Sequence, residues 1–210
     1  MLELTPETLK RACEDLSARD PALAQAYSTI GVPAWRSVPL TYQSLARIIV
    51  YQQISTRAAA SIWERLLNWS SHDLLASAVM NATETDLRGC GLSGPKVRHL
   101  KSIAEAVESG TLPLKALTDM EDENARNRLL SVKGIGPWTA DVFLMGALHR
   151  MDVFPVADVG LMEALRLLKD ADTRLSAKEF AAQSEAWRPW RGMAAHLLWG
   201  YLNHLRDTTP

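Results

Sequence analysis

Several features that mark particular classes of protein are scarce in this sequence of 210 residues. It has only two cysteines, Cys13 and Cys90, so neither a disulfide framework nor a four-thiolate metal or iron–sulfur site can be built. No stretch has the length of a membrane span, and the first residues lack the positive and apolar regions of a secretory signal. We therefore expect a soluble protein in the reducing cytoplasm, with no membrane partner.

An excess of positive charge is also missing. The chain has 23 Lys and Arg against 24 Asp and Glu, a formal net charge of -1. Proteins that coat nucleic acid through bulk electrostatics carry strongly basic surfaces. Any contact with nucleic acid must therefore come from local geometry, such as backbone amides at helix starts.

Strand patterns are absent as well, and the apolar spacing is helical nearly everywhere. Leu45, Ile49, Ile62 and Leu66 recur at helical intervals and predict two amphipathic helices across roughly 42 to 68. With 47% hydrophobic and 22% charged residues, the chain can bury a substantial core. We predict an all-α fold.

Helix starts are marked by local motifs. Thr118 to Glu121 and Ser176 to Glu179 both have the Ser/Thr-x-x-Glu form of a capping box, which predicts a helix beginning at each. Pro95, Pro137 and Pro189 each precede a helical pattern, as expected at a position where the missing N–H costs nothing.

The segment from Leu129 to Asp141 predicts a helix end, a tight turn and a new helix. In Gly134-Ile135-Gly136, two glycines permit positive φ and close backbone approach, and the isoleucine can anchor the turn in the core. Amides at the start of the second helix would suit a phosphate. Taken alone, this pattern equally fits a plain helix connection with a glycine cap.

Four blocks together carry a resemblance to a known family. They are Ile49-Val50-Tyr51-Gln52-Gln53-Ile54-Ser55; Gly91-Leu92-Ser93 with Lys96; Val132 to Ala140; and Val153 to Gly160 with the later Trp187-Arg188-Pro189-Trp190-Arg191 to Trp199. In this order and spacing the sequence resembles the helix-hairpin-helix (HhH-GPD) DNA glycosylase superfamily, within it the 3-methyladenine DNA glycosylase II branch. The resemblance runs from about Asp20 to Leu205.

The resemblance implies a compact, two-lobed, all-α glycosylase domain over residues 1–210, with the active-site cleft between the lobes. Residues 42–150 would form a central helical bundle with the hairpin at 132–137, and residues 1–41 plus 151–210 the second lobe. Some relatives carry an N-terminal β-domain, which we expect this compact version to lack.

The resemblance also implies that the hairpin clamps the DNA backbone beside the lesion. The matching residues are Lys133, Gly134, Ile135, Gly136 and Thr139. No cofactor is required, but a structural monovalent cation, Na⁺ or K⁺, would be held by the main-chain carbonyls of Leu130, Val132 and Ile135.

Asp158 opens an apolar helical pattern, so its simplest role is that of an N-cap. The family places its essential aspartate at the matching position, and both roles can coexist. A fixed carboxylate stabilises the positive charge that develops on the sugar when an N-glycosidic bond breaks. Relatives that also cut the backbone use a lysine where this chain has Trp138, and Lys133 does not match, so we predict hydrolysis without a lyase step.

Four residues match positions that line the base pocket: Trp138, Trp199, Val142 and Val159. The tryptophan faces would attract a cationic base, although core packing is the commoner role of tryptophan. Gln53 matches the wedge that enters the gap left by the flipped nucleotide, and its neighbour Gln52 could serve as internal glue. His149 and His196 are interpreted as structural or surface residues.

The function implied is that of a DNA-3-methyladenine glycosylase, a monomer acting on double-stranded DNA that contains alkylated purines such as 3-methyladenine and 7-methylguanine. Three alternatives stay open: a non-catalytic sensor of damaged DNA, a glycosylase for oxidised or mismatched bases, and a helical bundle that binds proteins.

Overall fold

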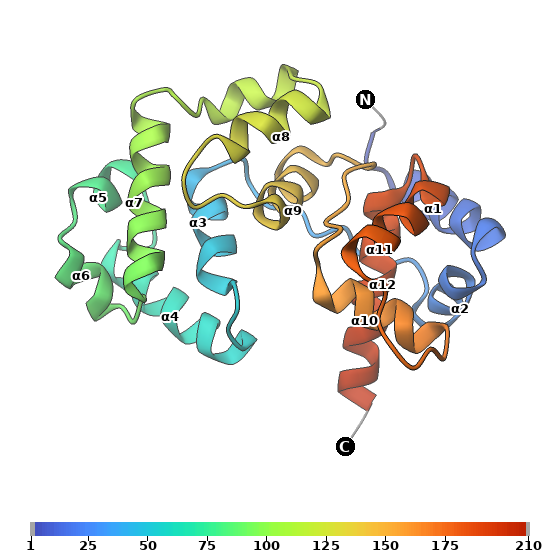
Figure 1. Cartoon of the computed structure of the whole chain (residues 1–210). Coiled ribbons are helices and arrows are strands. Elements are labelled where there is room, and N and C mark those ends of the chain that lie inside the picture. Colours follow the sequence, from blue (N-terminus) through green and yellow to red (C-terminus); the bar gives the residue numbers. More distant parts are fainter. Residues whose placement is uncertain (1–2, 209–210) are drawn as a thin grey trace. The chain divides into compact units, whose positions relative to one another are not determined.

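The computed structural model describes residues 3–208, and every regular element in that range is helical (Figure 1). The α-helices are α1 (Pro6–Arg19), α2 (Pro21–Ile30), α3 (Tyr42–Tyr51), α4 (Thr56–Trp69), α5 (Ala76–Asn81), α6 (Glu84–Gly89), α7 (Gly94–Glu108), α8 (Asp122–Leu130), α9 (Pro137–Leu148), α10 (Val159–Leu168), α11 (Ala177–Ser184) and α12 (Arg191–Thr208). Two 3₁₀ helices, η1 (Leu114–Asp119) and η2 (Glu185–Trp187), complete the set. The all-α prediction is confirmed, with no strand between residues 3 and 208.

The chain divides into two compact units, and the first of them is residues 38–148. Here α3 packs against α4, α7 and α9, while α7 also packs against α5 and α6, and α8 against α9 (Figure 1). Leu45, Ile49, Leu100, Ile103 and Phe143 are fully buried in its core. The helices predicted across 42 to 68 are confirmed as α3 and α4, and their apolar faces explain why this segment folds as it does.

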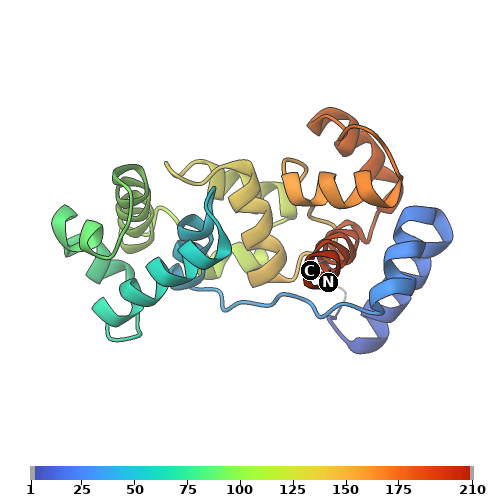
Figure 2. The same ribbon diagram turned by 90° about the horizontal axis from the view of Figure 1, so that it is seen from below.

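The second unit combines the two ends of the chain, residues 1–37 and 149–210, of which 1–2 and 209–210 lie outside the described residues. Its last helix, α12, packs against α1, α2 and α10, and α1 lies beside α2 (Figure 2). Phe154, Phe180 and Trp187 form an aromatic cluster with ring centroids 5.1 to 6.0 Å apart. The joining of both units into one glycosylase domain, with a cleft between lobes, stays a prediction.

One of the two predicted capping boxes is confirmed. The hydroxyl of Ser176 accepts from the Glu179 amide, and the Glu179 carboxylate accepts from the Ser176 amide, at the start of α11. The prediction at Thr118 is wrong, because Thr118 lies inside η1 and α8 begins at Asp122. The later start puts two acidic residues in the first turn of α8, where the helix dipole favours negative charge.

Both cysteines, Cys13 and Cys90, are free and buried. Burial raises the pKa of the Cys13 thiol to about 12, and it also raises the pKa of Cys90. Among residues 3–208, no helix combines the length and the apolar character needed to cross a bilayer.

Candidate functional site

The predicted hairpin is a tight turn between two helices. Helix α8 ends at Leu130 and α9 begins at Pro137. Gly134 has φ of +102°, and a Cβ atom there would lie 2.7 Å from Cβ of His99, so only glycine fits this position. Ile135 is buried, and its N–H donates to the Val132 carbonyl at 3.1 Å. The isoleucine therefore anchors the turn in the core, as predicted.

The outer side of the hairpin is accessible. Lys133 is exposed, and a Cβ atom at Gly136 would meet no atom within 4 Å. The side chain of Thr139 is buried, and its hydroxyl accepts a hydrogen bond from Nε2 of Gln52. A contact of Thr139 with a DNA phosphate would therefore have to use its backbone amide in the first turn of α9.

The carbonyls predicted to hold a monovalent cation lie on both sides of the Gly134 turn. The Val132 carbonyl accepts one hydrogen bond, from Ile135, and a carbonyl oxygen has two lone pairs. Neutral carbonyl oxygens are ligands that Na⁺ and K⁺ accept. The residues present fit such a cation, which stays a prediction.

The end of α3 separates the roles of the two neighbouring glutamines. Gln52 is half-buried, and its side chain donates to Thr139 of α9. Gln53 is exposed and has φ of +58°, in the left-handed region. The internal role considered for Gln52 is what the structure shows, and Gln53 is the exposed member of the pair. The wedge role itself stays a prediction.

Asp158 caps the amino end of α10, as predicted. Its Oδ1 accepts from the Leu161 amide at 2.9 Å, and the residue is only 8% exposed. At Gly160, a Cβ atom would lie 3.1 Å from that same oxygen. The helix start thus fixes the carboxylate in one orientation, and the glycine keeps the space beside it open.

A cation, Arg36, lies near Asp158. Partial removal from water lowers the pKa of the Arg36 guanidinium, and the Asp158 charge acts in the opposite direction. The guanidinium carbon lies 4.9 Å from the ring centroid of Trp199. The Trp199 ring thus faces a positive charge of the protein itself, and its predicted contact with a cationic base stays a prediction.

His196 holds the Arg36 segment in place. The Arg36 amide donates to Nε2 of His196 at 3.1 Å, and Nδ1 lies 2.7 Å from the Gly192 carbonyl. These contacts require a neutral imidazole with its proton on Nδ1. Burial lowers the pKa of His196 to about 4. The structural role expected for this histidine is confirmed.

The predicted pocket residues fall in both units. Trp138 and Val142 lie one turn apart on α9 and are half-buried. Val159 is 57% exposed next to Asp158, and Trp199 is half-buried on α12. Each pair lies within one unit, and a pocket shared by all four residues stays a prediction.

Reasoning from the sequence missed the contacts of two residues. Arg36 stands in a segment without any motif, and only the fold brings it to Asp158 and Trp199. Lys96 was noted as part of a motif, but its contacts with the end of α3 were not predicted. Its position in the first turn of a helix, where the dipole disfavours positive charge, was a usable signal.

The Gly-Ile-Gly hairpin between α8 and α9 places the chain among helix-hairpin-helix proteins, and a capping aspartate, Asp158, follows about twenty residues later. The comparison with family models makes the assignment specific. The model described as "HhH-GPD superfamily base excision DNA repair protein" matches residues 46–189, and the chain belongs to that superfamily.

Several relatives are similar to this protein over most of its length. DNA-3-methyladenine glycosylase 1 of Schizosaccharomyces pombe is 32% identical over 161 residues, which cover 75% of this chain and 71% of that protein. A DNA-3-methyladenine glycosylase of Bacillus subtilis is 27% identical over 176 residues, 79% of this chain and 58% of that protein. The matched segment thus spans from a little over half to about seven tenths of the length of these relatives.

Solved structures match the fold more completely. The S. pombe 3-methyladenine DNA glycosylase in complex with abasic DNA aligns with a TM-score of 0.83 and 29% identity, covering 90% of this chain and 95% of that one. A DNA-3-methyladenine glycosidase from Bacillus halodurans aligns with a TM-score of 0.78 and 29% identity, covering 98% of this chain and 93% of that one. An 8-oxoguanine glycosylase/lyase of Clostridium acetobutylicum shares the fold, with a TM-score of 0.78 and 18% identity.

Proposed function

We propose that this protein is a DNA-3-methyladenine glycosylase that hydrolyses the N-glycosidic bond of alkylated purines, such as 3-methyladenine and 7-methylguanine, and leaves an abasic site. The observation that carries the proposal is Asp158, a buried carboxylate oriented by its bond to the Leu161 amide in a chain of the HhH-GPD superfamily. Relatives named as DNA-3-methyladenine glycosylases support the choice of lesion.

The chemistry needs one fixed negative charge. When the glycosidic bond breaks, positive charge develops on the sugar, and the Asp158 carboxylate stabilises it or orients the attacking water. A purine alkylated at N3 or N7 already carries positive charge, so it departs without protonation by a strong general acid. Trp138 stands where lyases of the superfamily have lysine, and the reaction therefore ends with hydrolysis.

DNA binding is assigned to the hairpin and to the end of α3. The exposed Lys133 and the amides of the first turn of α9 contact phosphates, and Gln53 enters the duplex where the damaged nucleotide leaves. A cation on the carbonyls of Leu130, Val132 and Ile135 would orient this turn. The ligand is one damaged nucleotide in double-stranded DNA, so a monomer suffices, and cellular DNA as substrate places the protein inside the cell.

The direct test is release of free bases from duplex DNA treated with a methylating agent, identified by mass spectrometry. We expect 3-methyladenine and 7-methylguanine in the supernatant and abasic sites in the DNA. We also expect intact strands and no covalent adduct after borohydride treatment. Borohydride trapping would contradict the hydrolytic mechanism, and release of oxidised bases alone would contradict the lesion class.

A further inference from the structure

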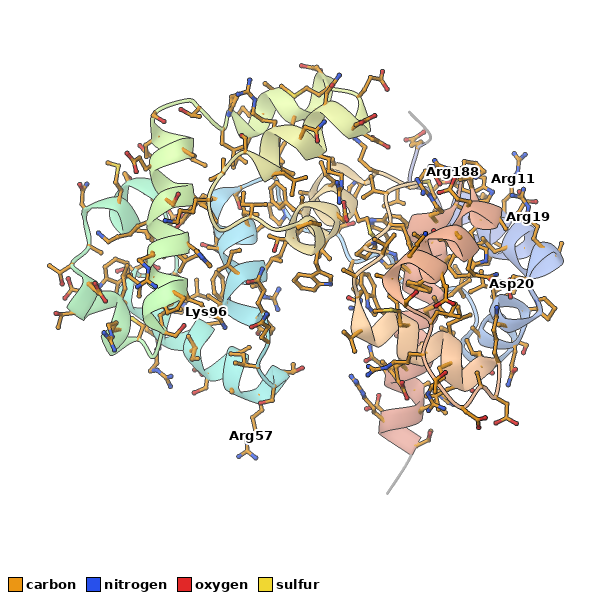
Figure 3. The ribbon with its side chains drawn as sticks, viewed as in Figure 1. Arg11, Arg19, Asp20, Arg57, Lys96 and Arg188 are labelled. Atoms are coloured by element: carbon orange, nitrogen blue, oxygen red, sulfur yellow. The ribbon has the colours of Figure 1, made fainter. Side chains whose placement is uncertain are left out.

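A lysine from one helix holds the end of another. Nζ of Lys96, in the first turn of α7, donates to the carbonyls of Val50 at 2.6 Å and Gln52 at 3.0 Å, at the end of α3 (Figure 3). The side chain is half-buried, and its partial removal from water lowers the pKa of Lys96. These bonds satisfy two of the carbonyls that a helix end leaves without partners.

The position of this lysine is unfavourable for its own helix. Positive charge is disfavoured in the first turn of a helix and favoured near the last. Lys96 therefore opposes the dipole of α7 while it stabilises the carboxyl end of α3. The charge of Lys96 thus acts on the end of α3 rather than on the start of its own helix.

The predicted wedge comes directly after the α3 end. Gln52 is held twice, by its carbonyl to Lys96 and by its side chain to Thr139, directly behind the hairpin. The next residue, Gln53, is exposed and takes a left-handed φ of +58° that a non-glycine residue rarely adopts. The anchors on Gln52 thus impose the direction in which Gln53 leaves the surface.

The same face of α7 reaches the hairpin. His99 lies one turn after Lys96, and a Cβ atom at Gly134 would lie 2.7 Å from its Cβ. One helix face therefore contacts both the loop that carries Gln53 and the turn assigned to the DNA backbone. Both are held against a single rigid element.

We propose that Lys96 is a positioning residue for opening the duplex: it fixes the α3 end so that Gln53 stands at the insertion position relative to the hairpin, without itself touching the substrate. The inference rests on the proposed function, because that function requires a damaged base to be flipped out of the duplex. The distortion of the duplex can be measured without base release.

The chain contains a matched control on the same helix. Nζ of Lys101, also half-buried, donates to the carbonyls of Met80 and Ala82 at the end of α5. Lys101→Met removes the same kind of contact from α7 but leaves the α3 end untouched. The two variants are compared by thermal melting, and Lys96→Arg serves as the conservative replacement.

The probe is a duplex that carries a tetrahydrofuran abasic analogue opposite 2-aminopurine. Insertion of a side chain disturbs the stacking of the opposite base and raises its fluorescence when protein binds. We expect wild type and Lys101→Met to give the full rise, Lys96→Met to fall to the level of Gln53→Ala, and Lys96→Arg to recover part of it. The double variant Lys96→Met/Gln53→Ala should behave like Gln53→Ala alone, because both changes remove one event.

Base release is measured in parallel. Lys96→Met should lower kcat on paired methylated duplex by about tenfold to a hundredfold and change it less than about twofold on single-stranded methylated DNA. Equal fluorescence of Lys96→Met and wild type, equal losses in Lys96→Met and Lys101→Met, or independent losses in the double variant would overturn the proposal. Failure of wild type to release any base contradicts the glycosylase, whereas the fluorescence series still decides the role of Lys96.

Discussion

Neighbouring residues of the same type have different surroundings here, and Gln52 and Gln53 show why. Their chemistry is identical, and the sequence left open which of them faces outward. The choice is made by Thr139 and Lys96, which stand 87 and 44 positions away from Gln52. A local pattern contains no information on such partners, so only the fold separates the two roles.

The surroundings of Asp158 could be predicted from the sequence, and those of Arg36 could not. An aspartate before an apolar helical pattern is an N-cap signal in the sequence itself, and the structure confirms the cap. Arg36 acquires its surroundings through the stacking of Trp35 on His196 and through its own position over Trp199. Those contacts join residues about 160 positions apart and have no local signature.

His196 gives a prediction for the dependence of stability on pH. Its pKa is about 4 in the folded protein against 6.5 in the unfolded chain, so the unfolded state binds the proton first as the pH falls. The contribution of neutral His196 to the free energy of unfolding is complete above pH 6.5. About 3 kcal/mol of this contribution is lost as the pH falls from 6.5 to 4. Denaturant unfolding at several pH values measures the free energy of unfolding of wild type and of His196→Gln. The gap in unfolding free energy between them should narrow toward pH 4, and a constant gap would refute the assignment.

Among the elements, helices were predictable because a buried face repeats with a period near 3.6 residues, as in α3 and α4. The false helix start at Thr118 shows the limit of short motifs. The Thr-x-x-Glu spacing is present, but the chain turns through η1 and is extended at Met120 before α8 begins. Where the local sequence fits both a 3₁₀ turn and a capped α-helix, packing against the rest of the unit determines which of the two forms.

The hairpin gives a paired prediction on its two glycines. Gly134→Ala places a methyl group 2.7 Å from His99 at a positive φ, and should lower the free energy of unfolding by roughly 2–6 kcal/mol. Gly136→Ala meets open space, so its stability should stay close to wild type while DNA binding weakens where the backbone approaches the phosphate. Thermal melting and fluorescence anisotropy with abasic duplex separate the two effects. Unchanged DNA binding by a stable Gly136→Ala variant would argue against the hairpin as the clamp.

For the whole molecule, the near-zero net charge limits how DNA is bound. With a formal charge of -1, binding must rest on a few placed contacts rather than on a basic surface. Lys133 is an exposed cation on the hairpin assigned to DNA, and Arg57, in the first turn of α4 after the Gln53 loop, is an exposed cation that projects from its unit in Figure 3. The residues predicted for the pocket belong to both units, which is why the sequence indicated them only through the resemblance.

The salt dependence of DNA binding tests this view. We expect a slope of log K against log salt of roughly -2 to -4 for duplex DNA. Lys133→Ala should reduce its magnitude by about 1, because one phosphate contact is lost. Lys115→Ala, an exposed lysine on η1, should leave the slope unchanged. A slope near -10, or equal effects of the two variants, would point to a broad electrostatic interface instead.

We propose Asp158 as the catalytic carboxylate, and the rate of base release by Asp158→Asn is the test of that role. Asparagine can still accept from the Leu161 amide, so the cap is kept while the charge is removed. Asp170→Asn is the control for the loss of one negative charge, since Asp170 is an exposed aspartate in the same unit. On methylated duplex DNA, Asp158→Asn should lose at least about 100-fold in kcat with abasic-DNA binding preserved, and Asp170→Asn should retain activity. Base release by Asp158→Asn at the wild-type rate would show that Asp158 is not the catalytic group, and an absence of release by wild type with DNA binding intact would identify a sensor of damaged DNA.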